Sequence, residues 1–342
     1  MNTISVIVPT HDRPTLLREA IRSIVAQSHA TFQVEIVVVD DGSNPPVDEV
    51  LLRREFGNNI LVIRNEIPRG LAWVRHQGVE AAKGEIITHL DDDDLFAPGV
   101  LQDAHLLLRD HPQVELLFLG VEGFGSRAEY FNRVQSEGVR TVIEAGNGAE
   151  LAVGTVVFGP SLLRALFRTV PSAFQHVVAR RTIWNAVSAL RRRAYMSASD
   201  DHDDAAARRQ ITGPLRDSEW ALYAAVACGS TMLLNRPCYL ARCGGQGFVS
   251  QSIQRDRHVG QGVLIMSKLL QAAARLPEFA QYELTVQKGV AKNFFDAAYY
   301  YFHQGNRPKA WLLLAKAIRI DFQFSHLKFG VRTLLPRTPI VD

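Results

Sequence analysis

The chain has few of the features that mark disulfide-rich, zinc-binding or membrane-spanning proteins. Only three of its 342 residues are cysteines, Cys228, Cys238 and Cys243. Their number is odd and no Cys-x-x-Cys pair occurs, so we expect reduced thiols in the cytosol, without a disulfide framework or a zinc site. There is no run of about 18 apolar residues, so no transmembrane helix is expected. The N-terminus also lacks the basic-then-apolar layout of a signal peptide.

An excess of charge of one sign is missing as well. The chain has 38 basic and 35 acidic residues, which gives a formal net charge of +3. This balance is too mild to indicate a nucleic acid partner, and none is predicted. With 47% apolar and 21% charged residues, the composition is that of a soluble protein with a core. The length suffices for one large domain, or for one domain and a smaller unit.

Over the first 120 residues, apolar β-branched runs alternate with segments of helical periodicity. Strands are predicted at 4–8, 34–40, 59–65, 85–90 and 114–120. Helices are predicted from Pro14 to Gln27, over 70–82, and from Pro98 to about Arg109. This alternation is typical of an α/β protein with a parallel sheet and helices on both faces.

After residue 120 the pattern is weaker. Residues 121–150 are interpreted as sheet and loop, and 155–168 as a strand that turns into a helix. A basic helix is predicted over 176–195 and another helix over 217–229. The last 80 residues are predicted to be mostly helical, with a hairpin that turns at Gly305-Asn306.

Three polar clusters stand at the ends of predicted strands. PTHD follows the first strand, DDGS the second and DDDD the fourth. In open α/β sheets, ligands bind in the crevice outside the carboxyl ends of the strands. Acidic residues at two such ends therefore predict a site for a cation that carries an anionic ligand.

The four consecutive aspartates, Asp91 to Asp94, repel one another unless something compensates their charge. In an extended chain Asp91 and Asp93 share one face, and Asp92 and Asp94 the other. Two carboxylates on one face can bind Mg²⁺ or Mn²⁺, which usually take one or two carboxylates plus substrate phosphates. The alternative is that they are turn and cap residues, and we favour it for Asp94 alone, because a cap requires only one acidic residue.

The segments SVIVPTHDRP, VVVDDGS and AAKGEIITHLDDDDLFAPG, in this order and spacing, resemble family 2 glycosyltransferases of the GT-A fold. The resemblance is close over residues 4–120 and looser to about 250, through GTVVF, DSEW and CGGQGFVS. It implies a GT-A domain over 1–250, with a nucleotide-binding half at 1–120 and an acceptor half at 121–250. The remainder, 251–342, is then a C-terminal helical region.

The resemblance also implies a set of nucleotide-binding residues. These are Pro9, Thr10, His11, Asp41, Arg75 and Asp92. The loop at Pro9 to His11 borders the base, and His11 stands where the family often has an aromatic ring. Asp41 reads the uracil edge and Asp92 lies near the ribose. Arg75 matches an arginine near the nucleotide, although His76 replaces the asparagine usual after it.

The metal-binding D-x-D motif of the family falls on Asp91-Asp92-Asp93. The resemblance makes Asp93 the first metal contact and Asp91 the second candidate, with Mn²⁺ or Mg²⁺ as the cofactor. Because the sugar nucleotide leaves as a diphosphate, negative charge grows there in the transition state, and a divalent cation stabilises it.

The family's base for the acceptor hydroxyl is a carboxylate at the start of a helix, and Asp217 takes that place. Arg216 stands where the family often has glutamate, and Glu219 is the second candidate. General-base help of this kind contributes ~10²–10⁴-fold. The alternative is that Asp217 is only a carboxylate favoured by the helix dipole.

Taken together, the resemblance implies metal-dependent, inverting sugar transfer in the cytoplasm. The donor is a nucleotide-sugar, with a UDP-sugar expected, and the acceptor is a hydroxyl of a glycan or lipid-linked molecule in surface polysaccharide synthesis. A sugar nucleotidylyltransferase shares the sheet and the metal, but it usually has a glycine-rich loop after the first strand, and PTHDRP contains no glycine. A catalytically inactive sugar-nucleotide-binding module is the non-enzyme alternative.

Basic and apolar residues interleave in the tail between Lys309 and Arg337. This pattern predicts either a peripheral contact with an anionic membrane surface or a helical cap that packs on the catalytic domain.

Overall fold

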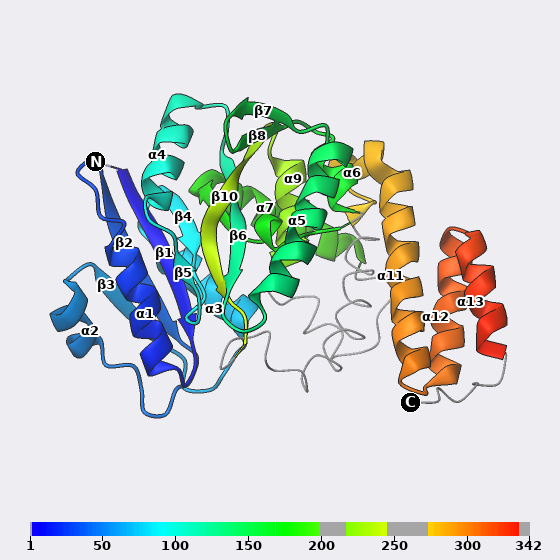
Figure 1. Cartoon of the computed structure of the whole chain (residues 1–342), viewed down its shortest axis with the longest axis horizontal. Coiled ribbons are helices and arrows are strands. Elements are labelled where there is room, and N and C mark those ends of the chain that lie inside the picture. The colour runs from blue at the N-terminus through cyan, green and yellow to red at the C-terminus, as the bar shows by residue number, and fades with distance from the viewer. Residues whose placement is uncertain (1, 168, 199–216, 245–272, 335–342) are drawn as a thin grey trace. The chain divides into compact units, whose positions relative to one another are not determined.

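A computed structural model of the chain describes residues 2–167, 169–198, 217–244 and 273–334 (Figure 1). The chain divides into two compact units. Unit 1 comprises residues 1–190 and 213–251, and unit 2 comprises 191–212 and 252–342. Residues 191–212 join unit 2 although they come earlier in the chain, and the boundary expected at 250 stays a prediction because it lies outside the described residues.

Unit 1 is built on one ten-stranded sheet. Its order is β3-β2-β1-β4-β9-β6-β10-β8-β7, and β5 pairs with β10 off this path. The strands are β1 (Asn2–Thr10), β2 (Phe32–Asp40), β3 (Ile60–Arg64), β4 (Ile86–His89), β5 (Leu95–Phe96), β6 (Leu116–Phe124), β7 (Ala149–Ala152), β8 (Thr155–Phe158), β9 (Val177–Arg180) and β10 (Thr231–Arg242). Strands β3, β2, β1 and β4 are parallel, whereas β9 runs antiparallel to β4 and β6.

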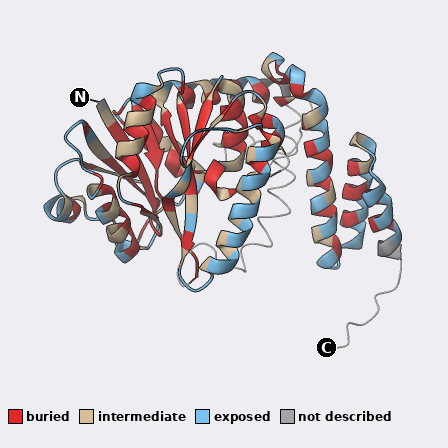
Figure 2. Ribbon diagram, turned by 45° about the horizontal axis from the view of Figure 1, so that its top comes forward, coloured by how far each residue is buried: buried red, intermediate tan, exposed pale blue. Residues whose placement is uncertain are grey.

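Helices cover both faces of this sheet, as Figures 1 and 2 show. They are α1 (Pro14–Val25), α2 (Glu49–Phe56), α3 (Leu71–Ala81), α4 (Val100–Asp110), α5 (Ala128–Ala145), α6 (Leu162–Leu166), α7 (Arg181–Ala198) and α9 (Asp217–Ala227). Side chains alternate along β1, so Ile4 and Val6 pack in the core that α1 and α4 cover, and Ile7 packs in the core that α3 covers. The predicted α/β class with helices on both faces is confirmed.

Two predictions beyond residue 120 are wrong. Residues 128–145 form the helix α5 instead of sheet and loop, and Val142 is its one buried residue. The segment is amphipathic at the helical period, a signal that the sequence prediction did not use. Residues 177–180 are the strand β9 instead of helix, inserted antiparallel between β4 and β6. Four apolar and basic residues are too few for their period to separate strand from helix.

The described part of unit 2 is helical. It contains α11 (Glu283–His303), α12 (Arg307–Ile320) and α13 (Phe324–Leu334), preceded by a 3₁₀ helix at Pro277–Tyr282. The predicted hairpin turn is confirmed, because Gly305 adopts φ 80° and the side chain of Asn306 accepts a hydrogen bond from the Lys309 amide. No helix within the described residues is both long and apolar enough to cross a bilayer.

Candidate functional site

The three polar loops that follow β1, β2 and β4 lie at one edge of the sheet. Thr10 at the end of β1 pairs with Asp40 at the end of β2, and Ile7 of β1 pairs with His89 at the end of β4. The Asp41 amide donates to the Thr10 carbonyl at 2.9 Å, and the Leu90 amide donates to the Ile7 carbonyl at 2.9 Å. The convergence expected from the order of the strands is therefore present in the structure.

Asp40, the first aspartate of DDGS, holds its own loop in place. It is fully buried and accepts hydrogen bonds from the amides of Ser43 (2.8 Å) and Val47 (3.1 Å) and from the Arg64 guanidinium (2.6 Å). Burial alone would raise the pKa of Asp40, but these bonds keep it below its ordinary value. The buried charge is thus compensated inside the loop.

Asp41, predicted to read the base, is engaged with the segment before α3. One oxygen accepts from Asn65 Nδ2 at 3.0 Å and from the Arg69 amide at 2.8 Å, and the other accepts from the Gly70 amide at 2.8 Å. A carboxylate has about four acceptor positions, so about one position of Asp41 is left for a ligand.

The loop after β1 lies against the DDGS loop. Pro9 is buried at the end of β1, and Thr10 Oγ1 donates to Asp92 at 2.7 Å. His11 is half exposed, and its Nδ1 lies 2.8 Å from the Asp41 carbonyl. Asp12 has φ 54° and its amide donates to Ser43 Oγ at 3.0 Å. Three loops that are far apart in the sequence therefore form one continuous surface.

The four aspartates form a turn instead of an extended strand. β4 ends at His89, and the Asp94 amide donates to the Asp91 carbonyl at 3.1 Å. The expectation that Asp91 and Asp93 share one face is therefore wrong, because side chains alternate only while the chain is extended. Asp92 and Asp93 instead face the same cation.

That cation is Arg13, which the sequence analysis missed. Its Nη1 lies 3.1 Å from Asp92 Oδ1 and 3.0 Å from Asp93 Oδ2. The sequence contains a signal for this ion pair. Arg13 is the one arginine of PTHDRP and lies directly before the Pro14 helix, in a loop expected to face four aspartates.

Arg75 pairs with the first aspartate of the turn. Its Nη2 lies 2.6 Å from Asp91 Oδ1, and the arginine is 8% exposed. Burial opposes ionisation of Asp91, but the charge of Arg75 keeps the pKa of Asp91 below its ordinary value. Arg75, which was predicted to bind the nucleotide, and Asp91, which was predicted as a second metal ligand, thus form an ion pair with each other in this structure.

The pKa values of Asp92 and Asp94 are shifted in the opposite direction. Burial raises the pKa of Asp92 to about 6, although Thr10 and Arg13 act against the shift. Burial, with the charges of Asp91 and Asp93, raises the pKa of Asp94 to about 8. Asp94 accepts a hydrogen bond from the Arg242 amide at 2.7 Å, which fits the structural role favoured for it.

Two further buried residues, one in β10 and one directly before β9, support the turn, and sequence reasoning did not find them. The hydroxyl of Tyr239 accepts a hydrogen bond from the Asp91 amide at 3.1 Å. The ring of His176 stacks on Tyr239 with centroids 3.6 Å apart. Neither residue lies in a recognisable motif, because their place under the turn depends on the strand order.

The acidic turn offers the oxygen donors that Mg²⁺ and Mn²⁺ prefer. No group of three or more His, Cys, Asp or Glu side chains forms a metal-binding arrangement within the part of the chain that the structure describes. The guanidinium of Arg13, however, already shows two carboxylates converging on one cation. This donor set fits an ion held by one or two carboxylates together with the phosphates of a ligand.

The candidate bases lie at the start of α9. Asp217 is the first residue of that helix, and its side chain, like Arg216, lies outside the described residues. Glu219 is buried and 5% exposed. Trp220 packs on Trp184 of α7, with ring centroids 4.4 Å apart, which fixes this end of α9 in unit 1.

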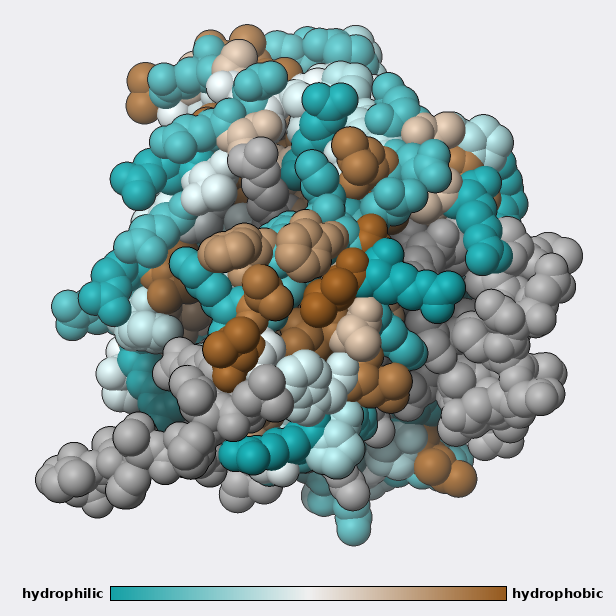
Figure 3. All heavy atoms as spheres, turned by 90° about the vertical axis from the view of Figure 1, so that its right-hand side faces the viewer, coloured by the Kyte–Doolittle hydropathy of each residue, from teal (hydrophilic) through white to brown (hydrophobic). Residues whose placement is uncertain are grey.

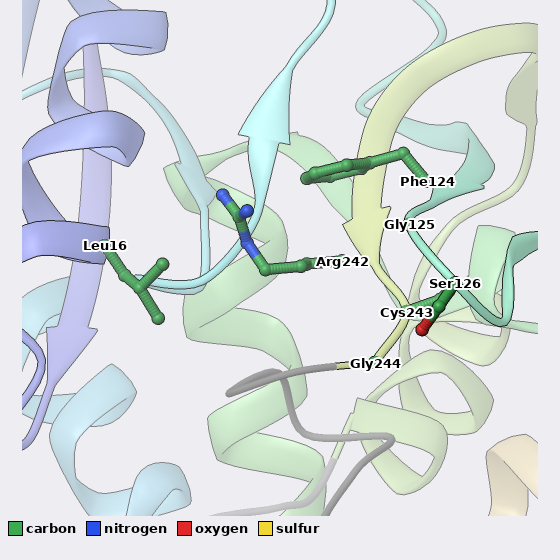
Figure 4. A pocket seen from close by; sticks show the side chains of 7 residues that line it. All are labelled: Leu16, Phe124, Gly125, Ser126, Arg242, Cys243 and Gly244. Atoms are coloured by element: carbon green, nitrogen blue, oxygen red, sulfur yellow. The ribbon is translucent and has the colours of Figure 1, made fainter.

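A cavity of about 380 Å³ opens beside the aspartates (Figure 4). It is lined by Leu16, Phe124, Gly125, Ser126, Arg242, Cys243 and Gly244. The guanidinium of Arg242 lies 4.8 Å from the ring centroid of Phe124, and its Nε donates to the Asp93 carbonyl at 2.8 Å. A small ligand in this cavity would therefore lie next to the acidic turn.

The chain is similar to known proteins both in sequence and in fold. The family model described as Glycosyl transferase family 2 matches residues 5–143. An uncharacterized glycosyltransferase of Haemophilus influenzae is 29% identical over 115 residues, which is 34% of this chain and 37% of that protein. The GalNAc(5)-diNAcBac-PP-undecaprenol beta-1,3-glucosyltransferase of Campylobacter jejuni is 35% identical over 103 residues, 30% of this chain and 33% of that protein. The matches thus span about a third of the length of these curated relatives.

Among solved structures, S. aureus TarS residues 1–349 in complex with UDP-GlcNAc aligns with a TM-score of 0.53. The alignment covers 99% of this chain and 95% of that one at 17% sequence identity, so it shows the fold alone. It confirms the expected GT-A class with a C-terminal helical extension. In sequence, residues 5–143 of this chain match the model of glycosyl transferase family 2, and proteins named glycosyltransferases are similar to it.

Proposed function

We propose that the protein transfers a sugar from a nucleotide-sugar, with inversion, to a hydroxyl of a glycan or lipid-linked acceptor. The observation that carries the proposal is the meeting of the loops after β1, β2 and β4, where Thr10 and Arg13 bind Asp92 at the carboxyl edge of the strands, in a region that matches the family 2 model. Ligands of open α/β sheets bind at this edge.

The nucleotide is proposed to bind over the loops at Pro9–His11 and Asp41. The remaining acceptor position of Asp41 suits an N–H donor such as N3 of uracil, and the exposed imidazole of His11 offers a face for the base. Asp92 would lie near the ribose, and Arg75 would hold Asp91 in its ionised form.

Asp93, with Asp91 as the second candidate, would hold Mn²⁺ or Mg²⁺ together with the diphosphate. When bound, such an ion stabilises the charge that develops on the leaving diphosphate. Arg13 pairs with Asp93, and also with Asp92, so it has to yield or share Asp93 when the ion binds. Its guanidinium would then be close enough to pair with a phosphate oxygen.

Asp217 is proposed as the base that takes the proton of the acceptor hydroxyl, with Glu219 as the alternative. A carboxylate at the first position of a helix is kept ionised by the helix dipole, as a base requires. The acceptor would be bound by the second half of unit 1, where the cavity at Phe124 and Arg242 adjoins the acidic turn.

The class of substrate is suggested by relatives. The Campylobacter jejuni enzyme acts, by its name, on an undecaprenol-linked glycan, and TarS was solved with UDP-GlcNAc. On this basis we propose a UDP-sugar donor, an acceptor in surface polysaccharide synthesis, and a cytoplasmic site of reaction.

The proposal is tested by thermal unfolding with UDP, GDP, dTDP and CDP, each with and without Mn²⁺. A ligand at about 100 times its Kd adds ~2.7 kcal/mol of stability, which is easily measured. We expect one diphosphate, UDP, to stabilise the protein only with Mn²⁺, and Asp93→Asn to remove this effect. Asp110→Asn, which changes an exposed carboxylate paired with Arg109, is the matched control and should behave as wild type.

If no nucleotide stabilises the protein under any condition, the proposal is wrong. If UDP stabilises it but neither sugar transfer nor hydrolysis of a UDP-sugar is found, the protein is a binding module and not an enzyme.

A further inference from the structure

Unit 2 exposes apolar side chains on two successive helices and on the link between them. We call this surface the α12–α13 face. Its apolar residues are Trp311, Leu312, Phe322, Phe324, Leu327 and Val331, and its basic residues are Lys316, Arg319 and Lys328. In Figure 3, which looks onto the C-terminal helices, apolar side chains gather among hydrophilic ones.

The exposure of these apolar side chains is large. Phe324 is 66% exposed, Phe322 61%, Leu312 58%, Val331 53% and Leu327 48%. Single exposed apolar residues are normal on a protein surface, but a contiguous group marks a site of interaction with a protein or a membrane. Six exposed apolar residues lie between positions 311 and 331.

The exposed stripe is not required for packing of the helices. On α13, the buried side is made by His326 and Phe329, whose rings lie 4.8 Å and 5.4 Å from Phe295 of α11. Phe324, Leu327 and Val331 follow one another at helical spacing on the other side. The helix is therefore apolar on two sides, and among the described helices of unit 2 the side of His326 and Phe329 is the one that packs on α11.

The charge around the stripe is almost entirely positive. Between Gly305 and Leu334 the chain has six basic residues and one acidic residue, Asp321. On α12, Leu312, Lys316 and Arg319 lie on one exposed face. On α13, Lys328 Nζ lies 5.4 Å from the ring centroid of Phe324, so a cation and an apolar ring occupy the same patch.

We propose that the α12–α13 face lies on a lipid surface that carries anionic head groups. Aromatic and aliphatic side chains would enter the boundary between head groups and acyl chains, while the basic side chains reach the phosphates. A second copy of the chain is a poor occupant, because it would bring the same basic residues opposite one another. The inference goes beyond glycosyl transfer, since it depends only on residues of unit 2.

The test is co-sedimentation of the full chain with vesicles of phosphatidylcholine alone or mixed with phosphatidylglycerol at 3:1. We expect binding to the mixed vesicles and at least tenfold weaker binding to pure phosphatidylcholine. Raising NaCl from 0.1 to 0.5 M should weaken the binding, because salt screens charges at a surface.

Two sets of substitutions separate the apolar and the electrostatic contributions. The variant Phe322→Ser/Phe324→Ser/Leu327→Ser and the variant Lys316→Glu/Arg319→Glu/Lys328→Glu should each lower binding at least tenfold. All six side chains are exposed, so unchanged thermal unfolding is expected. Leu284→Ser is the matched control, since Leu284 is 64% exposed on α11 but lies outside the face.

Binding that is equal on both vesicle types, or that survives both variants, would overturn the inference. So would a dimer in the absence of lipid that the serine variant converts to a monomer, because the occupant would then be a second copy. Asp93→Asn should bind vesicles as the wild type does, so failure of the proposed enzyme activity and failure of this inference are distinguishable.

Discussion

Arg13 places a positive charge between two carboxylates that are predicted to serve a metal and a ribose. Its Nη1 lies within 3.1 Å of Asp92 and 3.0 Å of Asp93, and the charges of these carboxylates raise the pKa of the guanidinium further. At the scale of residues, the charge of the acidic turn is therefore partly compensated by the chain itself. Any divalent ion has to compete with this internal cation.

Replacing Arg13 by alanine should strengthen binding of Mn²⁺ in the absence of nucleotide. Losing a charge-assisted hydrogen bond of ~1.5–3 kcal/mol to the same oxygens corresponds to about tenfold or more in Kd. The measurement is titration of free Mn²⁺ by electron paramagnetic resonance. Arg18→Ala is the matched control, because Arg18 lies on α1, which follows Arg13 directly, but pairs with Glu55 at the surface. Equal affinity of Arg13→Ala and wild type would show that Arg13 does not compete.

The assignment of the base is a second question at this scale. Asp217→Asn should lower kcat by ~10²–10⁴-fold while leaving the Kd of the donor unchanged, because a general base acts on the acceptor proton and not on the nucleotide. The measurement is the steady-state rate together with donor binding. Glu219→Gln, two residues along α9, is the comparison. A larger loss in Glu219→Gln than in Asp217→Asn, with thermal unfolding unchanged, would reverse the assignment.

At the scale of elements, α3 lies so close to the sheet that there is no room for a side chain at position 78. A Cβ built on Gly78 would lie 2.3 Å from Ile7 Cγ2, and Ile7 is fully buried in β1. The close approach brings the start of α3 to Asp41 and the arginine of its second turn, Arg75, to Asp91. The packing of one glycine thus contributes to the geometry of the site.

Gly78→Ala should lower the free energy of unfolding. A helical alanine gains ~1 kcal/mol over glycine, but overpacking of a tight core typically costs ~1–3 kcal/mol, and the clash with a buried β1 side chain favours the upper part of this range. Urea unfolding measures the difference. Gly229→Ala, at a position where an added Cβ meets nothing within 4 Å, serves as the control. A Gly78→Ala protein as stable as wild type would mean that α3 can shift away from β1.

At the scale of the whole molecule, the pH dependence of stability reflects groups that lie under and around the acidic turn. Burial lowers the pKa of His176 to about 3, so the folded protein keeps this imidazole neutral well below the pH at which the unfolded chain is protonated. The unfolded state then binds more protons, and the contribution of His176 to stability is lost as pH falls below about 6.5. The raised pKa values of Asp92 and Asp94 act in the opposite direction.

The contribution of His176 can therefore be measured as the difference in the free energy of unfolding between the wild type and His176→Gln. The destabilisation caused by His176→Gln should shrink by ~1.4 kcal/mol for each pH unit between 6.5 and 5, because the wild type loses stability there through His176 and the variant does not. Urea unfolding at pH 7.5, 6.0 and 5.0 gives this difference. His29→Gln, at an exposed position, should show no such trend. A constant difference for His176→Gln would contradict the buried neutral histidine.

The sequence by itself determined most elements of the first 120 residues and the loops that end them, but not the short helix α2 or the two-residue strand β5. β1, α1, β2, β3, α3, β4 and α4 were all predicted from apolar periodicity, and the helix hairpin at Gly305 from its turn residues. These features depend on neighbours in the chain, so local pattern is enough to find them. The position of PTHD, DDGS and DDDD at one edge followed from the parallel order of the strands.

Only the tertiary structure decided which side chains of that edge meet. Arg13 and Asp93 are 80 positions apart, and Tyr239 lies 148 positions from Asp91. The insertion of β9, the turn of the aspartates and the engagement of Asp41 with the start of α3 are likewise set by contacts between distant segments. Hydrogen bonds and burial between such distant segments produce no periodic pattern in the sequence. The strands and helices that bring these segments together do produce such a pattern.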